Sequence, residues 1–250
     1  MKKLLTLSLT LVLLGVGCAK VVPATPQAPS PEVAQQEQKV FAEQTGLVNG
    51  SYLLDAMTSQ IQWKASEVTM NHNGTVMARE GSVRLLDGQP VDGSVLVDMV
   101  TMKNLNLRGA FLTQFESHMR SNDFFDIKQY PTASFAIKSL EPLTGITGSN
   151  YRVDGEMTIK NVTNKVSFPA NIQKTDTGLN LVGHMVIDRT LYGIQFRSAK
   201  FFEKLGDKMI DDEFFLDLDL VFTGPATEEQ LKSADEAKKE GDGSGDIKGS

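Results

Sequence analysis

The clearest pattern in this chain is an alternation of apolar and polar residues that begins near Gly50 and continues to about Thr223. A period of two places one face of a β-strand in a core and the other face in water. About eight short segments show this period: residues 61–65, 83–85, 95–99, 135–137, 157–159, 166–168, 179–187 and 214–222. The pattern predicts an all-β domain of about eight antiparallel strands, arranged as an up-and-down barrel or a sandwich.

Turn signals accompany these segments. Glycine after Asn, Asp or Thr favours the positive φ angles that tight hairpin turns require. Five such pairs occur in the alternating region: Asn73-Gly74, Asp87-Gly88, Asp92-Gly93, Asp154-Gly155 and Thr177-Gly178. We expect a turn at each of them.

One segment, Arg108 to Arg120, follows the helical period instead. Its apolar residues Phe111, Leu112, Phe115 and Met119 fall on one face. A helix with this apolar stripe is expected to cap the mouth of the barrel.

Two adjacent phenylalanines, Phe124 and Phe125, follow the helix. Pro131 disfavours helical geometry at Tyr130, so the helix must end before that point and a strand must follow. The pair therefore lies where a helix passes into a strand, at the rim of the sheet. Two interpretations remain open, a hydrophobic plug and a contact with a ligand.

The first 17 residues are expected to be a signal peptide. Lys2 and Lys3 are followed by an apolar run, residues 4–16, that is shorter than the ~20 residues a spanning helix needs. The run ends in Gly15-Val16-Gly17-Cys18, which resembles a bacterial lipobox, although that pattern prefers a larger apolar residue at position 15. The resemblance implies a lipid-anchored Cys18 held in the membrane by several acyl chains. An ordinary secretory signal with an incidental cysteine is the alternative.

The segments that flank the alternating region differ from it in composition. Residues 18–47 contain four prolines among Ala, Gln and Ser, which is typical of an extended spacer, so we assign the folded domain to residues 48–224. Residues 225–250 form a polar tail. In this tail, Thr227-Glu228-Glu229-Gln230 resembles a capping box, and Leu231 to Glu240 is expected to be a solvated helix.

Charge and cysteine content exclude several function classes. The net charge is −6, and loss of Lys2 and Lys3 with the signal peptide leaves 23 basic against 31 acidic residues, or −8. This balance argues against nucleic-acid binding and against electrostatic docking to anionic lipid. A single cysteine also excludes an intrachain disulfide and a cysteine-based metal site.

Catalytic and metal-binding motifs are not evident. The three histidines, His72, His118 and His184, are not spaced as metal ligands. We interpret Asp188-Arg189 as a local ion pair at a strand end. The acidic residues of 207–213 do not have EF-hand spacing and are expected to be solvated turn residues. No catalytic residue and no metal are therefore predicted.

Five stretches, in this order, resemble the YceI-like family of bacterial periplasmic and secreted proteins. They are Val68–Gly74, Ser117–Phe135, Gly155–Pro169, Ile187–Ile194 and Leu205–Asp212. The resemblance covers about Gly50 to Thr223. The chain departs from the family pattern at Asn161, where Gly is usual, and at Met119, where Leu is usual. Both changes are mild, because Asn tolerates left-handed turns and Met keeps the apolar volume.

This resemblance implies a lipocalin-like antiparallel barrel whose apolar tunnel holds an isoprenoid lipid, such as a polyisoprenoid quinone. Flexible methionines suit a tunnel that accepts a long, branched tail. No cofactor is expected besides the bound lipid, and the partners expected are this lipid and the membrane that holds the anchor. The candidate ligand-binding residues are Trp63, Phe111, Phe115, Met119, Phe124, Phe135, Met157, Met185, Ile194 and Leu216.

On this interpretation the protein is not an enzyme. It would bind its lipid in the bacterial cell envelope, anchored at the periplasmic face of the outer membrane. One alternative is an enzyme that acts on an isoprenoid lipid, which would need polar groups converging on the tunnel. Another is a structural envelope module whose barrel is filled by its own side chains.

Overall fold

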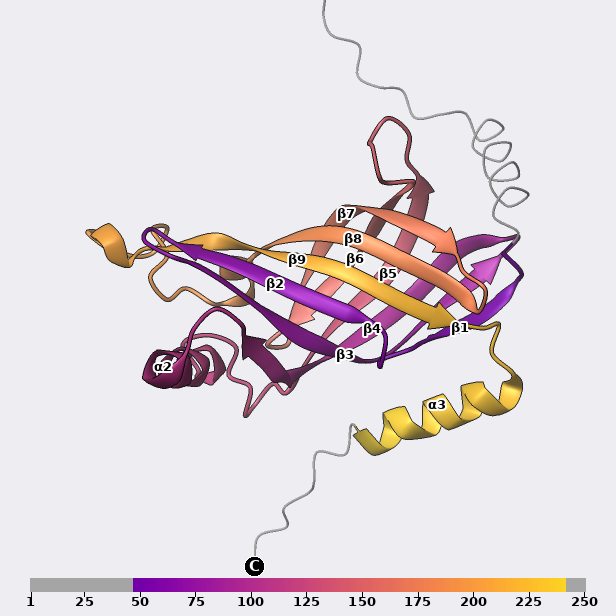
Figure 1. The fold of residues 1–250 in the computed structure, drawn as a ribbon, viewed down its shortest axis with the longest axis horizontal. Coiled ribbons are helices and arrows are strands. Elements are labelled where there is room, and N and C mark those ends of the chain that lie inside the picture. The colour runs from indigo at the N-terminus through magenta and orange to yellow at the C-terminus, as the bar shows by residue number, and fades with distance from the viewer. Residues whose placement is uncertain (1–46, 242–250) are drawn as a thin grey trace, which may run out of the picture.

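The computed structural model describes residues 47–241, and the side chains of residues 235–241 are not part of that description. The predicted signal peptide, Cys18 and nearly all of the spacer therefore lie outside the described residues. Within them the chain forms one antiparallel sheet of nine strands, two α-helices and two short 3₁₀-helices (Figure 1). The strands are β1 (Gly50–Leu54), β2 (Gln60–Glu67), β3 (Asn71–Leu86), β4 (Gln89–Asn104), β5 (Thr132–Pro142), β6 (Tyr151–Ile159), β7 (Val162–Lys174), β8 (Gly178–Asp188) and β9 (Ile210–Thr223). The helices are α2 (Gly109–Arg120), α3 (Glu228–Gly241), η1 (Arg189–Tyr192) and η2 (Gly206–Lys208).

Eight of the strands close into a barrel. From β2 the order runs through β9, β8, β7, β6, β5, β4 and β3, and β3 pairs again with β2. The extra strand, β1, pairs with both β3 and β9 at one end. Every barrel strand is thus paired on both sides, which removes the exposed edges of an open sheet. The expected all-β, lipocalin-like antiparallel barrel is confirmed, and the sandwich is excluded.

The period-two pattern follows directly from this closure. In the β8–β9 pair, Met185 lies opposite Leu216, and Leu181 lies opposite Leu220. These four side chains face the barrel interior, and polar neighbours such as Asp217 face outward. Residues two apart along a strand share a face, so each strand contributes one apolar row to the interior.

Three of the five predicted turns are wrong. Gly74, Gly93 and Gly155 lie inside β3, β4 and β6, whereas Asp87-Gly88 joins β3 to β4 and Thr177-Gly178 precedes β8. A Cβ at Gly155 would lie 2.4 Å from the Phe135 ring, and one at Gly74 would lie 2.3 Å from the Trp63 ring. These glycines let an aromatic ring lie across the neighbouring strand, so close packing rather than turn geometry requires them.

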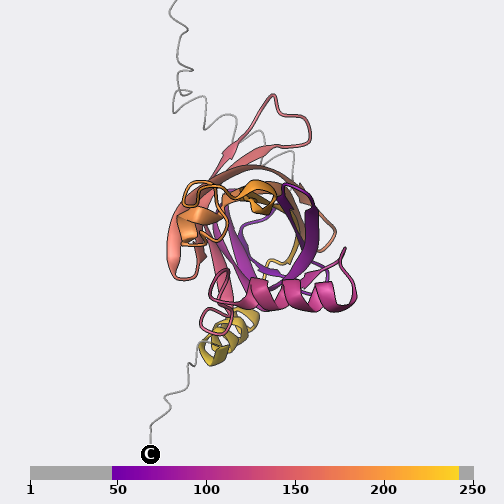
Figure 2. The same ribbon diagram turned by 90° about the vertical axis from the view of Figure 1, so that its left-hand side faces the viewer.

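The helix predicted from the second period is confirmed as α2. Figure 2 shows this helix lying along the rim at one end of the barrel. Phe115 and Met119 pack against the hydrophobic core, as the apolar stripe predicts. We refer to this end, where η1 and the β2–β3 turn also lie, as the α2 end.

The capping box at the start of α3 is also confirmed. The Thr227 amide donates to Gln230 Oε1 at 2.8 Å, and the Gln230 amide donates to Thr227 Oγ1 at 3.3 Å. Together these two bonds satisfy donors that the first turn of a helix leaves free. In Figure 1, α3 stands away from the barrel wall.

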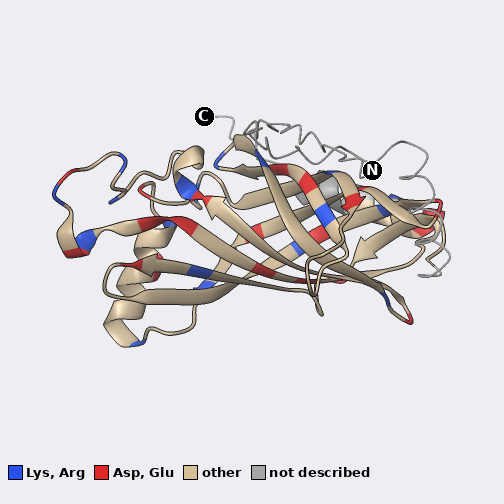
Figure 3. Cartoon of the chain, turned by 90° about the horizontal axis from the view of Figure 1, so that it is seen from above, with Lys and Arg blue, Asp and Glu red and all other residues tan. Residues whose placement is uncertain are grey.

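Charged residues of both signs are scattered along the strands (Figure 3). Many form pairs, such as Lys64 with Asp217 at 2.7 Å and Lys138 with Glu156 at 3.0 Å. No helix within residues 47–241 is both long and apolar enough to cross a bilayer.

Candidate ligand-binding cavity

An elongated apolar cavity occupies the barrel interior. All eight barrel strands line it, together with α2 and the segments at the α2 end. Its volume open to water-sized spheres is about 130 Å³. Lining residues on β9 run from Ile210 to Phe222, which corresponds to ~40 Å along a strand at ~3.3 Å per residue. The space is therefore long and narrow.

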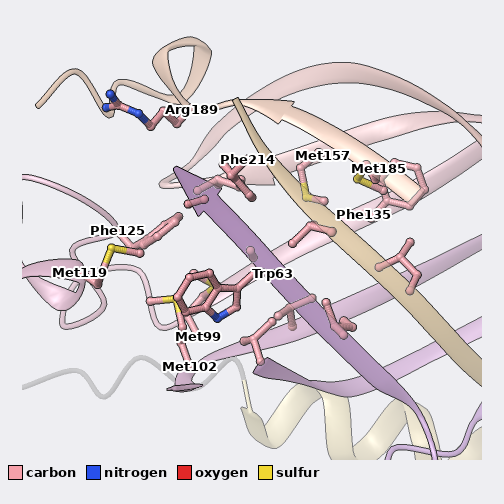
Figure 4. A pocket seen from close by; sticks show the side chains of 18 of the residues that line it. Trp63, Met99, Met102, Met119, Phe125, Phe135, Met157, Met185, Arg189 and Phe214 are labelled. Carbon is pink, nitrogen blue, oxygen red and sulfur yellow. The ribbon is translucent and has the colours of Figure 1, made fainter. Parts of the chain in front are cut away.

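Nine of the ten predicted ligand-binding residues line this cavity. They are Trp63, Phe115, Met119, Phe124, Phe135, Met157, Met185, Ile194 and Leu216. They come from five strands, α2 and the segments that follow α2 and η1, and several of them surround the space in Figure 4. The structure thus brings residues separated by up to 153 positions to one surface, although whether they contact a ligand stays a prediction.

The tenth residue, Phe111, is misplaced by the sequence prediction. Its side chain is 77% exposed and does not line the cavity. Phe111 lies in the first turn of α2, where the neighbouring residues are exposed as well. The apolar face of α2 extends beyond the part of the helix that contacts the barrel. The first turn of α2 therefore remains exposed to solvent.

The pair Phe124 and Phe125 is buried, and both rings line the cavity. Phe125 packs edge-on against Phe214, with ring centroids 6.4 Å apart, and Phe124 lies 5.7 Å from Phe196. These aromatic contacts hold the corner between α2 and β5 against the barrel. The pair is thus a hydrophobic plug in the wall that also forms part of the cavity surface, and its contact with a ligand stays a prediction.

Some lining residues were missed. Met99 continues the alternation of residues 95–99, so the sequence pattern predicts that it faces inward. Met102 also lines the cavity, although an alternation continued from residue 99 would place it on the outer face. The register of β4 against β3 shifts near this point, where Met77 faces Asp98 but Thr75 faces Lys103. An extra residue in one strand of a pair reverses the side of the sheet on which the following side chains lie. A strict period of two in the sequence does not predict such a reversal.

Polar lining residues gather at the α2 end: Ser66, Glu67, His72, Arg189 and Asp211. The remaining 27 of the 32 lining residues are apolar. Glu67 pairs with Ile210 in the sheet, next to Asp211, and His72 pairs with Ala65. The cavity therefore has one polar end and a long apolar body.

Arg189 does not form the local ion pair with Asp188 that the sequence predicted. It is buried, and it donates at 2.9 Å to the carbonyls of Ile194, Ile210 and Asp211. Its charge faces Asp212 at 3.5 Å. Burial lowers the pKa of the Arg189 guanidinium, and the nearby carboxylates oppose that effect. Its role is to fasten the segment after η1 to the start of β9.

Asp188 has other partners. It accepts hydrogen bonds from the Thr190 amide and hydroxyl and from Lys200 Nζ. Burial raises the pKa of the Asp188 carboxyl, but the bonds from Lys200 and Thr190 outweigh it and keep the pKa below its usual value. Asp212 is likewise shielded, with an 18% exposed side chain, and pairs with Arg189 and Lys200. The prediction that these acidic residues are turn residues is wrong for Asp211, Asp212 and Glu213, which lie in β9, and Asp212 is in addition shielded from solvent.

The histidines do not converge. His118 pairs with Asp123 at 3.2 Å, and His184 pairs with Asp217 at 2.7 Å on the outer face of the barrel. His72 is 6% exposed and lines the cavity, with Nε2 3.2 Å from Glu67 Oε1. Among residues 47–241 no group of three or more potential metal ligands occurs.

Residues 52–222 match the YceI-like domain. The match covers more than half of the chain and includes the barrel strands β2 to β8 completely and β9 up to Phe222. The chain belongs to the YceI-like family. The part that precedes β1 and the helix α3 fall outside the matched YceI-like residues.

Two solved structures are similar to this YceI-like protein. BcnA of Burkholderia cenocepacia is 18% identical with a TM-score of 0.53, and the alignment covers 67% of this chain and 98% of that one. A polyisoprenoid binding domain from Saccharophagus degradans, implicated in plant cell wall breakdown, is 13% identical with a TM-score of 0.51, covering 71% and 100%. At these identities the likeness concerns the fold. A comparison with curated proteins finds no match.

Proposed function

We propose that this protein binds an isoprenoid-type lipid, such as a polyisoprenoid quinone, inside the barrel and stores or carries it in the bacterial cell envelope. The observation that carries the proposal is the cavity, which is long, narrow and apolar over 27 of its 32 lining residues. Burying ~10 methylene equivalents at ~0.8 kcal/mol each contributes about 8 kcal/mol before ordering costs. That is a substantial driving force for a ligand with few polar groups.

Two further observations support an isoprenoid tail. Five methionines line the cavity, and thioether side chains adapt to a branched and kinked chain at little cost: Met99, Met102, Met119, Met157 and Met185 (Figure 4). The similar Saccharophagus degradans domain is itself described as polyisoprenoid binding. Its likeness supports a ligand class and leaves the particular lipid open.

The cellular location is part of the same proposal. Cys18 would be acylated after removal of residues 1–17, and the proline-rich residues 18–47 would act as a spacer between the membrane and the barrel. A protein held beside the membrane would meet its lipid where the lipid is abundant. We place it at the periplasmic face of the outer membrane because Ala19, rather than Asp, follows the cysteine. This resembles the sorting signal of outer-membrane lipoproteins in proteobacteria.

An enzyme acting on such a lipid is the second candidate, and the structure offers it less support. Of the polar lining residues, Arg189 is engaged with three carbonyls and Asp212, so its donors serve the fold. A nucleophile with an adjacent base is not evident among the described lining residues. Binding is therefore the function that the geometry favours.

The proposal is tested by filling the cavity. Ala133 faces inward on β5, so Ala133→Phe places a ring in the space that the lipid would occupy. Its matched control is Ala136→Phe, the same change three residues along the same strand on the side that does not line the cavity. Organic extraction and mass spectrometry should find isoprenoid lipid in the wild type and the control, and at least about tenfold less in Ala133→Phe.

Denaturant unfolding of all three proteins accompanies this measurement, because overpacking a core costs about 1–3 kcal/mol. Absence of any lipid from the wild type after gentle purification and after incubation with a polyisoprenoid quinone would contradict the proposal. It would favour a barrel filled by its own side chains.

A further inference from the structure

One nitrogen in the polar end of the cavity has no hydrogen-bond partner. His72 lies on the inner face of β3, its ring lines the cavity, and its Nδ1 atom is buried without a partner among the described residues. Leaving a buried polar atom without a hydrogen bond destabilises the fold, so such atoms are uncommon. An unpartnered atom in a ligand cavity is a candidate contact for the ligand.

The neighbour of His72 decides which kind of contact Nδ1 can make. Its other ring nitrogen, Nε2, lies 3.2 Å from Glu67 Oε1. A carboxylate only accepts hydrogen bonds, so Nε2 carries the proton in this pair. In the neutral imidazole Nδ1 is then a bare acceptor. It is suited to a ligand that donates a hydrogen bond.

A second unpartnered atom lies in the same part of the wall. Trp63 Nε1 is buried without a partner among the described residues, and an indole only donates. Trp63 pairs with Gly74 and Ala65 with His72, so Trp63 and His72 are diagonal neighbours on one face. Phe115 of α2 packs on both, with ring centroids 6.3 Å from Trp63 and 4.4 Å from His72. The aromatic enclosure thus offers one acceptor and one donor.

The charges at this end disfavour an anionic head group. Glu67 lines it, and its carboxylate, which lies beside His72, would repel a phosphate. Arg189 is the one cation among the described lining residues, and its three nitrogens already donate to backbone carbonyls. A neutral group that both donates and accepts fits the available partners best.

We infer that the polar end is a head-group site for a hydroxyl-bearing isoprenoid, in which His72 Nδ1 accepts a hydrogen bond from a phenolic or alcoholic hydroxyl. Glu67 is a positioning residue, since it holds the imidazole through Nε2. Trp63 and Phe115 enclose the ring of the head group. This inference rests on the proposed function, and it specifies that the reduced hydroquinone form of a quinone binds more tightly than the oxidised form.

The test compares a hydroquinone and a quinone with identical decyl tails, titrated anaerobically into the purified protein stripped of lipid. Because the tail is the same, the ratio of the two dissociation constants reports the head group. The wild type should bind the hydroquinone about five- to tenfold more tightly, the effect of one hydrogen bond of about 1 kcal/mol.

Three variants separate the two nitrogens of His72. His72→Gln keeps a polar group facing Glu67 but removes the Nδ1 acceptor, so the ratio should fall to about one. His72→Asn places an amide oxygen near the former Nδ1 position and should retain most of the preference. The control is His184→Gln, since His184 also pairs with a carboxylate but is 53% exposed on the outer face; its ratio should equal that of the wild type.

The outcomes separate this inference from the proposed function. Equal affinities of the wild type for both probes, or an unchanged ratio in His72→Gln, would overturn the head-group site while lipid binding stands. Failure of the wild type to bind either probe would overturn both. If His72→Gln does not fold, as judged by its denaturant midpoint, a wild-type ratio near one or a lost preference in His72→Asn still overturns the head-group site.

Discussion

At the scale of single residues, the cavity depends on which aromatic side chains reach the interior. Phe111 and Phe115 are one helical turn apart on α2 and have the same chemistry. Phe115 lines the cavity and packs on Trp63 and His72, whereas Phe111 is exposed to solvent. The same substitution at these two positions therefore separates a role in the cavity from a general effect on the helix.

We predict that Phe115→Ser reduces co-purified isoprenoid several-fold and that Phe111→Ser leaves it unchanged. A hydroxyl in the apolar lining costs about 1–3 kcal/mol and weakens lipid binding, while a hydroxyl at position 111 faces water. Lipid content by mass spectrometry and denaturant midpoints of the stripped proteins provide the comparison. Full lipid content in Phe115→Ser, together with badly reduced stability, would show that this ring is only a core residue.

At the scale of elements, α3 is separate from the barrel in structure and in sequence. Its described side chains, residues 228–234, are mostly exposed, and it lies outside the YceI-like match. The segment just before it is different. The Gly224 amide donates to the Thr177 carbonyl at 2.9 Å, and the Ala226 amide donates to the Ser51 carbonyl at 2.7 Å. These bonds attach residues 224–226 to the end of the barrel.

We predict that a chain ending at Thr227 unfolds with a free energy within about 0.5 kcal/mol of the wild type, as expected for the loss of exposed residues. A chain ending at Thr223 is the control. It also loses the two bonds to Thr177 and Ser51, and it should be less stable by about 1–2 kcal/mol. Urea unfolding measures both. A large loss of stability in the longer truncation would mean that α3 supports the barrel.

At the scale of the whole molecule, closure of the sheet explains how a barrel of this size keeps an apolar space. All eight barrel strands are paired on both sides, so the backbone hydrogen bonds of the wall do not depend on what fills the interior. The inner side chains can therefore leave a cavity without opening the sheet.

The proposed anchor belongs to this scale, since it governs where the barrel is held. We predict that Cys18→Ser moves the protein from the membrane fraction to the soluble fraction while the far-ultraviolet circular dichroism of the barrel is unchanged. The reason is that the acyl chains are lost and no residue of the barrel is altered. Fractionation with immunodetection provides the measurement. A variant that still sediments with membranes would refute the lipoprotein assignment.

Much of the fold could be predicted because its signals are local. Alternation along β8 and β9, the helical stripe of α2 and the capping box at Thr227 each depend on residues within a few positions of one another. At Asn161, where the chain departs from the family pattern, φ is positive, consistent with the tolerance of Asn for left-handed geometry. These features can therefore be predicted from short segments of the sequence.

The features that were predicted wrongly depend on residues far apart in the chain. Local spacing predicts a turn at Gly155, but the Phe135 ring that requires this glycine lies on another strand. Local spacing also predicts an ion pair between Arg189 and Asp188, but two of the carbonyls that Arg189 binds belong to β9. Met102 faces inward because of a register shift against β3. Each outcome depends on a neighbouring strand that cannot be identified from the spacing of residues along the sequence.

By itself, then, the sequence determined that this protein is an antiparallel all-β domain with one amphipathic helix and an apolar interior, since the side-chain period is local, and the barrel followed from the family resemblance. Only the tertiary structure decided that the interior is a long cavity with one polar end. Glu67, His72, Arg189 and Asp211 come from four separate segments and meet only when the barrel closes. The pairing of β2 with β3 sets which nitrogen of His72 stays free, because it places Glu67 beside Nε2.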